Sequence, residues 1–203
     1  MVTVQLKGNA WLRQRCSTRV QLHYKGQAMF DYQPRLNGEL LDLRPAQPAD
    51  FDGLFAAASD PEVWALHPHS DRYLEPVFRA YFEDGLKSGS ALVAVAKADG
   101  VIAGWSRYSA EFAQPGEIEI GWTFLGRPWW GGAYNGEMKR LMLAHAFRFV
   151  DRVIFRIGEH NLRSRRAVEK IGGRLTDRTE VVTAGGVESR HLFYAIDRGG
   201  IKV

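Results

Sequence analysis

The segment Arg127-Pro-Trp-Trp-Gly-Gly-Ala-Tyr-Asn-Gly-Glu137 joins a strand pattern over residues 117–124 to a helical pattern over residues 137–150. Gly131 and Gly132 allow a tight turn and a close backbone approach to a ligand. Such a turn leaves backbone N–H groups unpaired in front of the positive end of the helix dipole. The segment lacks the patterns of a P-loop and of a dinucleotide-binding turn. It predicts a phosphate or pyrophosphate site, with an ordinary glycine-rich turn as the alternative.

The segments on either side of this turn alternate between strand and helix patterns, which predicts one mixed α/β domain over residues 29–203. Asp99-Gly100 is a hairpin turn signal, and residues 183–186 join a second hairpin. We expect strands at 40–44, 91–96, 101–108, 117–124, 153–157, 175–182 and 189–196, and helices at 49–58, 74–86, 137–150 and 163–171.

The net charge of +4 comes from the first 28 residues, which contain five basic and no acidic side chains. Removing those five from the 27 Lys and Arg leaves 22 basic against 23 acidic residues, so the body is nearly neutral and is not expected to bind nucleic acid. We interpret residues 1–28 as a basic N-terminal extension that is disordered or lies upstream of a true start at Met29. An organelle transit peptide is the other interpretation of this segment.

The chain of 203 residues is long enough to bury one full core. It has no apolar run near 18 residues, so no membrane span is expected. Its one cysteine, Cys16, permits neither a disulfide framework nor a cysteine-based zinc site within the chain, and a reducing, cytoplasmic location is expected.

Polar residues that can carry chemistry occur in two places besides the turn. Strand alternation puts Glu117 and Glu119 on one face, where a carboxylate either meets a cleft, pairs with an arginine or is solvated. Asn161 and Ser164 stand where a strand gives way to a helix, so each is either an N-cap or a ligand contact. The three arginines that follow Asn161, at positions 163, 165 and 166, are either exposed to solvent or bind an anionic ligand.

The loop after the first helix contains Trp64, His67, His69 and Asp71. Its two histidines are spaced i, i+2, and a metal site would need a third ligand of defined spacing, which is not evident. We therefore expect no metal.

Three motifs in the right order make the chain resemble the GNAT superfamily of acetyl-CoA-dependent N-acetyltransferases, and most closely its RimJ/RimL-like branch. The resemblance covers roughly residues 40–196. The motifs are Glu119-Ile-Gly-Trp122, then Trp130-Gly-Gly-Ala133-Tyr with Glu137, and then Asn161-x-x-Ser164-x-x-Ala167-x-x-Lys170-x-x-Gly173. The resemblance implies an α/β fold of GNAT type, with a mixed, mostly antiparallel central sheet and helices on both faces.

The resemblance also implies acetyl-CoA as co-substrate. The residues implied in holding it are Phe124, Leu125, Arg127, Gly131, Gly132, Ala133, Tyr134, Asn135, Asn161 and Ser164. Two departures bear on these roles. Pro128 fills the slot where relatives carry Gln or Arg, and Arg127 stands one residue early. Val168 stands where many relatives carry a tyrosine acid, so Ser164 is the implied substitute toward the CoA thiolate.

We expect direct acetyl transfer to a primary amine in a ternary complex, with Glu119 as general base through water and Ser164 as acid. Backbone N–H groups near Phe124 and Leu125 would polarise the thioester carbonyl. The loop residues Trp64, His67, His69 and Asp71 are candidates for acceptor contacts. The acceptor can be a protein N-terminus, a polyamine or an antibiotic amine. A non-catalytic acyl-CoA sensor or partner module is the alternative function, and either a monomer or a homodimer fits the sequence.

Overall fold

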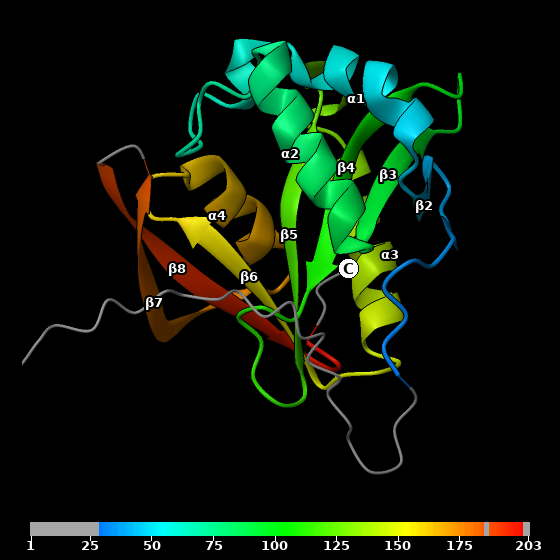
Figure 1. The fold of residues 1–203 in the computed structure, drawn as a ribbon. Coiled ribbons are helices and arrows are strands. Elements are labelled where there is room, and N and C mark those ends of the chain that lie inside the picture. Colours follow the sequence, from blue (N-terminus) through cyan, green and yellow to red (C-terminus); the bar gives the residue numbers. More distant parts are fainter. Residues whose placement is uncertain (1–28, 185–186, 201–203) are drawn as a thin grey trace, which may run out of the picture.

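A computed structural model describes residues 29–184 and 187–200 (Figure 1). Its sheet has eight strands in the order β1-β2-β3-β4-β5-β6-β8-β7. All neighbours are antiparallel except β5 and β6, which run parallel. The strands are β1 (Leu36–Asn37), β2 (Leu41–Pro45), β3 (Ala91–Ala96), β4 (Ile102–Ser109), β5 (Glu117–Leu125), β6 (Arg152–Gly158), β7 (Arg174–Ala184) and β8 (Val187–Asp197).

Four α-helices and three 3-10 turns connect these strands. They are η1 (Pro48–Asp50), α1 (Phe51–Ala58), η2 (Pro61–Val63), α2 (Glu75–Ser88), η3 (Arg127–Trp129), α3 (Tyr134–Ala146) and α4 (Leu162–Lys170). Figure 1 shows α2 lying across the sheet in front of the strands. The predicted mixed, mostly antiparallel sheet is confirmed, with helices on both faces. Among the described residues no helix is long and apolar enough to span a bilayer.

Strand alternation divides the core into two layers. Leu92 and Ala94 of β3 pack with the α3 residues Met138 and Met142 on one face. On the other face, Val93 packs with aromatic residues of α1 and α2 and with Trp105. Because each face is buried under helices, β3 is apolar along its whole length, as expected for a central strand.

Two of the strands and α-helices differ from the sequence prediction by more than one or two residues at an end. The short strand β1 was not predicted, because two residues carry no periodicity. Helix α3 begins at Tyr134 and ends at Ala146, so both ends lie earlier than predicted. The early start puts Glu137 in the first turn of α3, where its carboxylate accepts the backbone N–H groups of residues 39, 40 and 41 at 2.7, 2.9 and 2.9 Å. One side chain thereby joins α3 to the β1–β2 turn.

The sheet opens between β5 and β6. These strands pair only over three residues, from Glu117 with Arg152 to Glu119 with Ile154. The register of β5 against β4 shifts after Gly121, and Trp122 takes a left-handed conformation with φ of 53°. Beyond this bulge the facing edges of β5 and β6 have no strand between them, which leaves backbone groups of both strands free to meet a ligand.

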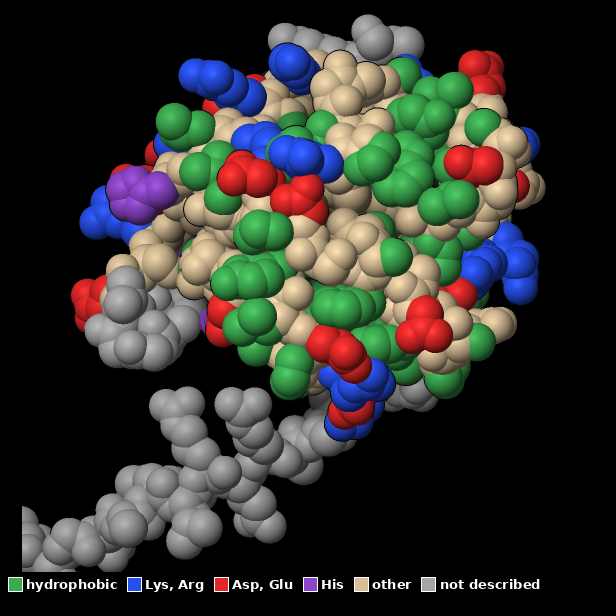
Figure 2. All heavy atoms as spheres, turned by 90° about the horizontal axis from the view of Figure 1, so that it is seen from above, with side chains coloured by type: hydrophobic (Ala, Val, Ile, Leu, Met, Phe, Trp, Pro, Cys, Tyr) green, Lys and Arg blue, Asp and Glu red, His purple; other side chains and the backbone are tan. Residues whose placement is uncertain are grey.

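Figure 2 shows the molecule from above. Basic and acidic side chains are interspersed over this face, and neither sign gathers into one continuous patch. This distribution agrees with the nearly neutral charge of residues 29–203.

Candidate active site

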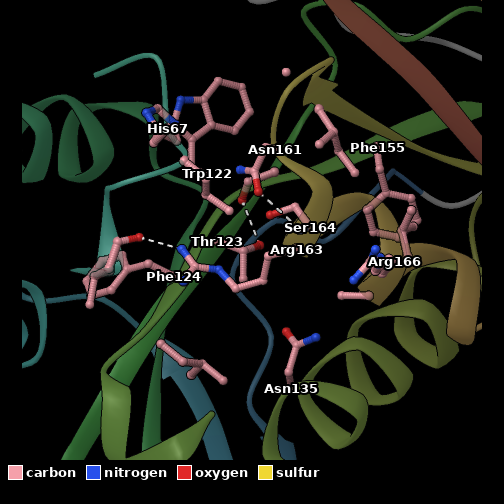
Figure 3. A pocket seen from close by; sticks show the side chains of 18 of the residues that line it. His67, Trp122, Thr123, Phe124, Asn135, Phe155, Asn161, Arg163, Ser164 and Arg166 are labelled. Carbon is pink, nitrogen blue, oxygen red and sulfur yellow. Dashed lines mark hydrogen bonds between the residues drawn. The ribbon is translucent and has the colours of Figure 1, made fainter. Parts of the chain in front are cut away.

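A cavity of about 700 Å³ occupies the opening between β5 and β6. Its walls come from the loop after η2, the end of β5, the glycine turn before α3, the end of β6 and the start of α4. Figure 3 shows His67 and Trp122 toward one end of this cavity and Asn135 at the other. Of the residues predicted as site residues, the cavity is lined by Trp64, His67, Phe124, Leu125, Gly131, Gly132, Asn135, Asn161 and Ser164.

The glycine turn is open to the cavity. Gly131 has φ of 71°, and a Cβ placed there would meet no atom within 4 Å. A Cβ on Gly132 would meet only the Tyr134 ring, at 4.0 Å. The turn therefore has room beside it, and α3 starts immediately behind it with its N–H groups directed forward. Two cations of α4, Arg166 and Lys170, line the same cavity.

Three residues predicted to hold CoA do not line the cavity: Arg127, Ala133 and Tyr134. The Arg127 guanidinium instead pairs with Asp60, with Nε 2.8 Å from the carboxylate. The anion-binding capacity of this end therefore rests on backbone N–H groups and on α4.

The strand β5 presents one free backbone group beside the turn. The Leu125 carbonyl accepts the Trp130 indole N–H at 2.7 Å, and the Gly126 N–H donates to Ala103 of β4 at 2.9 Å. Backbone groups alternate sides along a strand, so the Leu125 N–H points to the open edge and the Phe124 N–H points to β4. Of the two N–H groups expected to polarise a carbonyl, only that of Leu125 faces the opening.

Asn161 and Ser164 form the start of α4. The Asn161 carboxamide oxygen accepts the Ser164 backbone N–H at 3.1 Å, which makes Asn161 the N-cap of this helix. The Arg163 guanidinium reaches over the cavity to the Val63 carbonyl, at 2.9 Å, and stacks 4.0 Å from the Trp130 ring (Figure 3). Arg163 thus joins α4, the last residue of η2 and the glycine turn.

Glu119 lies beneath the cavity rather than in its wall. Its side chain is 2% exposed, and its Oε2 has no hydrogen-bond partner among the described residues. Burial raises the pKa of Glu119 to about 7, although Arg156, with Nε 3.8 Å from Oε1, opposes this shift. Gly121 lines the cavity directly beside it, and a Cβ there would lie 2.9 Å from Oε1. The missing side chain at Gly121 keeps a route open from the carboxylate to the cavity.

Glu117 has a structural role. Its carboxylate pairs with Arg178 at 2.7 Å and with Arg152 at 3.8 Å. The strand face that carries Glu117 and Glu119 is buried and not solvated.

The sequence reading missed Lys139, a buried lysine of α3 that lines the cavity. Its Nζ donates to the Thr123 hydroxyl on the β5 bulge, at 2.5 Å. Burial lowers the pKa of Lys139 to about 7, so part of the population is neutral at neutral pH. Its spacing from Leu143 and Ala146 puts it on the apolar face of the predicted helix, and this signal was available in the sequence.

The acceptor candidates divide into two groups. Trp64 and His67 line the cavity, together with Arg72 of the same loop and Tyr81 of α2. His69 and Asp71 lie outside it and are exposed. No group of three or more His, Cys, Asp or Glu side chains within the described part of the chain is arranged to hold a metal ion.

Comparison with known proteins agrees with this geometry. A family model described as an acetyltransferase (GNAT) domain matches residues 41–174. No curated protein matches the chain.

Among solved structures, the chain is similar to a GCN5-related N-acetyltransferase from Brucella melitensis, with 20% identity, a TM-score of 0.72, and coverage of 83% of this chain and 80% of that one. It is also similar to a GNAT-family acetyltransferase from Bacillus anthracis, with 20% identity, a TM-score of 0.68, and coverage of 82% and 99%. Mycobacterium smegmatis RimJ in complex with CoA-disulfide matches with 17% identity, a TM-score of 0.59, and coverage of 82% and 87%.

The open parallel pair of strands, the glycine turn before α3 and the family match define an acyltransferase. The chain belongs to the GNAT acetyltransferase family, whose members use acetyl-CoA.

Proposed function

We propose that this protein transfers an acetyl group from acetyl-CoA to a primary amine, directly within a ternary complex, and that it belongs to the RimJ/RimL-like branch. One observation carries this proposal: the free edges of β5 and β6 enclose a cavity that ends on the open glycine turn. Such an opening can accept an extended amide chain by backbone hydrogen bonds while the turn holds a diphosphate.

The residues present fit acetyl-CoA, which supplies the acetyl group as a thioester. Gly131 and Gly132 leave space beside their backbone, and a side chain at either position would fill part of it. Asn135, Arg166 and Lys170 add donors and positive charge to the cavity wall. These groups would hold the phosphates, and the Leu125 N–H would polarise the thioester carbonyl.

Glu119 is our candidate for the general base. Its raised pKa lets it hold a proton near neutral pH, and Gly121 leaves room for a water between the carboxylate and the cavity. Ser164 lines the cavity at the start of α4 and is our candidate for the group that donates a hydrogen bond to the leaving thiolate. Val168 fills the position of the tyrosine acid of many relatives and is buried, so the chain offers no phenol there.

The test is release of free CoA thiol from acetyl-CoA in the presence of a panel of primary amines. We expect turnover with at least one amine, and we expect Ser164→Ala to lower kcat about 10–100-fold with little change in KM for acetyl-CoA. Ser59→Ala is the matched control, because Ser59 is an exposed serine that does not line the cavity.

The alternative function, an acyl-CoA-binding module without turnover, predicts a different result. CoA would then raise the melting temperature, but no amine would release thiol. Equal kcat for Ser164→Ala and the control would remove Ser164 from the mechanism and leave the transferase function standing.

A further inference from the structure

The acceptor end of the cavity contains an arginine without an acidic partner. Arg72 comes from the loop between η2 and α2 and lines the cavity. Its guanidinium carbon lies 4.0 Å from the Tyr81 ring centre and 5.4 Å from that of Trp64. Within residues 29–184 and 187–200, no carboxylate lies within 4 Å of its guanidinium nitrogens.

The neighbouring arginines Arg107 and Arg156, unlike Arg72, form ion pairs. Arg107 pairs with Asp84 at 2.9 Å, and Arg156 pairs with Glu180 at 2.6 Å. Both cations are therefore committed within the fold. Arg72 is shielded from water by two aromatic rings and keeps its charge unpaired, which is costly unless a ligand neutralises it.

His67 adds a second donor beside Arg72. Its Nδ1 accepts the His69 backbone N–H at 3.0 Å, so a neutral ring carries its proton on Nε2. Burial and the charge of Arg72 hold the pKa of His67 well below its ordinary value, which favours the neutral ring. Nε2 lies 3.3 Å from the Arg72 Nη1. Two N–H donors thus stand side by side with no acceptor between them.

Tyr81, whose ring lies against Arg72, contacts the bulge of β5. The Tyr81 hydroxyl donates to the Trp122 carbonyl at 2.7 Å and accepts the Trp105 indole N–H at 2.9 Å. Trp122 is the left-handed residue of the β5 bulge. An anion held by Arg72 is therefore one aromatic side chain away from the bulge, where an acceptor amine would attack the thioester carbonyl.

The acidic groups closest to Arg72 in the sequence and in α2 are either in an ion pair or outside the cavity. Asp84 is paired with Arg107, and Asp71 is exposed outside the cavity. His191 of β8 lines the cavity, with a buried Nδ1 that has no partner among the described residues. No carboxylate is among the described residues that line the cavity.

We propose that the acceptor is a primary amine that also carries a carboxylate, which Arg72 and His67 bind as paired donors. This inference rests on the proposed acetyl transfer and names its substrate class. A guanidinium fork and an imidazole N–H match the two oxygens of a carboxylate. Polyamines are disfavoured, because a second ammonium group would meet the charge of Arg72.

The experiment compares free amino acids with their carboxamides and with a linear diamine, using the chain of residues 1–203. Peptides that begin with Glu or Gln form a second matched pair, which shows whether a side-chain carboxylate serves equally well. We expect kcat/KM to be at least about 10-fold higher for the carboxylate member of a pair. Arg72→Gln should lower kcat/KM for the carboxylate substrate about 10–100-fold, mostly by raising its KM. It should leave kcat/KM for the carboxamide and the KM for acetyl-CoA unchanged.

Arg72→Lys should keep part of the preference for the carboxylate over the carboxamide, because lysine keeps the positive charge but lacks the paired N–H donors of the guanidinium. Arg79→Gln is the matched control, since Arg79 is an exposed arginine of α2 that pairs with Glu75. If Arg72→Gln lowered kcat/KM equally for the carboxylate and the carboxamide, Arg72 would only support the loop. That result would contradict the carboxylate inference and leave the proposed transferase function intact. If no amine is acetylated at all, both the inference and the proposed function fall.

Discussion

Glu119 combines a carboxylate with a position almost closed to solvent, and this combination determines its chemistry. Its pKa is raised from 4.5 to about 7 because burial disfavours the charged form. The folded protein therefore binds the proton more tightly than the unfolded chain does. Stability contributed by the neutral carboxyl is present at low pH and is lost as pH rises from about 4.5 through 7.

Glu119→Gln should separate catalysis from stability. The wild-type kcat/KM should rise with pH through an apparent pKa near 7, and this rise should disappear in the variant together with most of the activity. The variant keeps a neutral group at every pH. Its unfolding free energy relative to wild type should therefore be higher at pH 8 than at pH 5, by roughly 1–3 kcal/mol, and its relative melting temperature should rise accordingly. The charge of Glu119 raises the pKa of Lys139, so this difference includes the response of Lys139 to the substitution. An unchanged pH profile of activity would remove Glu119 as the base.

At the scale of elements, the glycine turn and α3 act together because Glu137 fixes where the helix lies. Its carboxylate accepts three backbone N–H groups of the β1–β2 turn, and the approach is so close that a Cβ on Gly38 would lie 2.7 Å from it. The helix start that faces the cavity is thereby attached to the far edge of the sheet.

Glu137→Ala should leave these three N–H groups without partners. We expect a loss of roughly 2–4 kcal/mol in unfolding free energy, which corresponds to about 5–15 °C in melting temperature for a domain of this size. Glu75→Ala is the matched control, because Glu75 also stands in the first turn of a helix but is exposed and holds only a surface ion pair with Arg79. Similar melting temperatures for the two variants would contradict this role for Glu137.

At the scale of the whole molecule, the described residues of the core layers run from Phe30 to Ile196. We therefore propose that residues 29–203 form the GNAT domain by themselves. The bulge in β5 and the opening beyond it depend on packing from both faces of the sheet, so the CoA site should form only when the whole domain folds.

A chain that starts at Met29 should have the same melting temperature as the full-length chain. CoA at 100 times its Kd should stabilise both by about 2.7 kcal/mol, which raises the melting temperature by several degrees. Thermal unfolding with and without CoA provides the measurement. A chain from Met29 that unfolds earlier, or that no longer responds to CoA, would show that residues 1–28 belong to the domain.

The sequence by itself determined the order of the elements other than β1, and the turn before α3. These features depend on periodicity and on glycine, which act over a few residues and are visible in the chain. It also gave a helix cap as one of two roles for Asn161, because capping is a local hydrogen bond.

Only the tertiary structure decided which charged groups are free. Arg127 was expected at the phosphates but is paired with Asp60, whereas Arg72 was not considered and stands unpaired over Tyr81. Burial of Glu119 and Lys139, and the opening between β5 and β6, likewise come from contacts between segments far apart in the sequence. Long-range packing sets desolvation and ion pairing, so these determinants of the chemistry are absent from any local pattern.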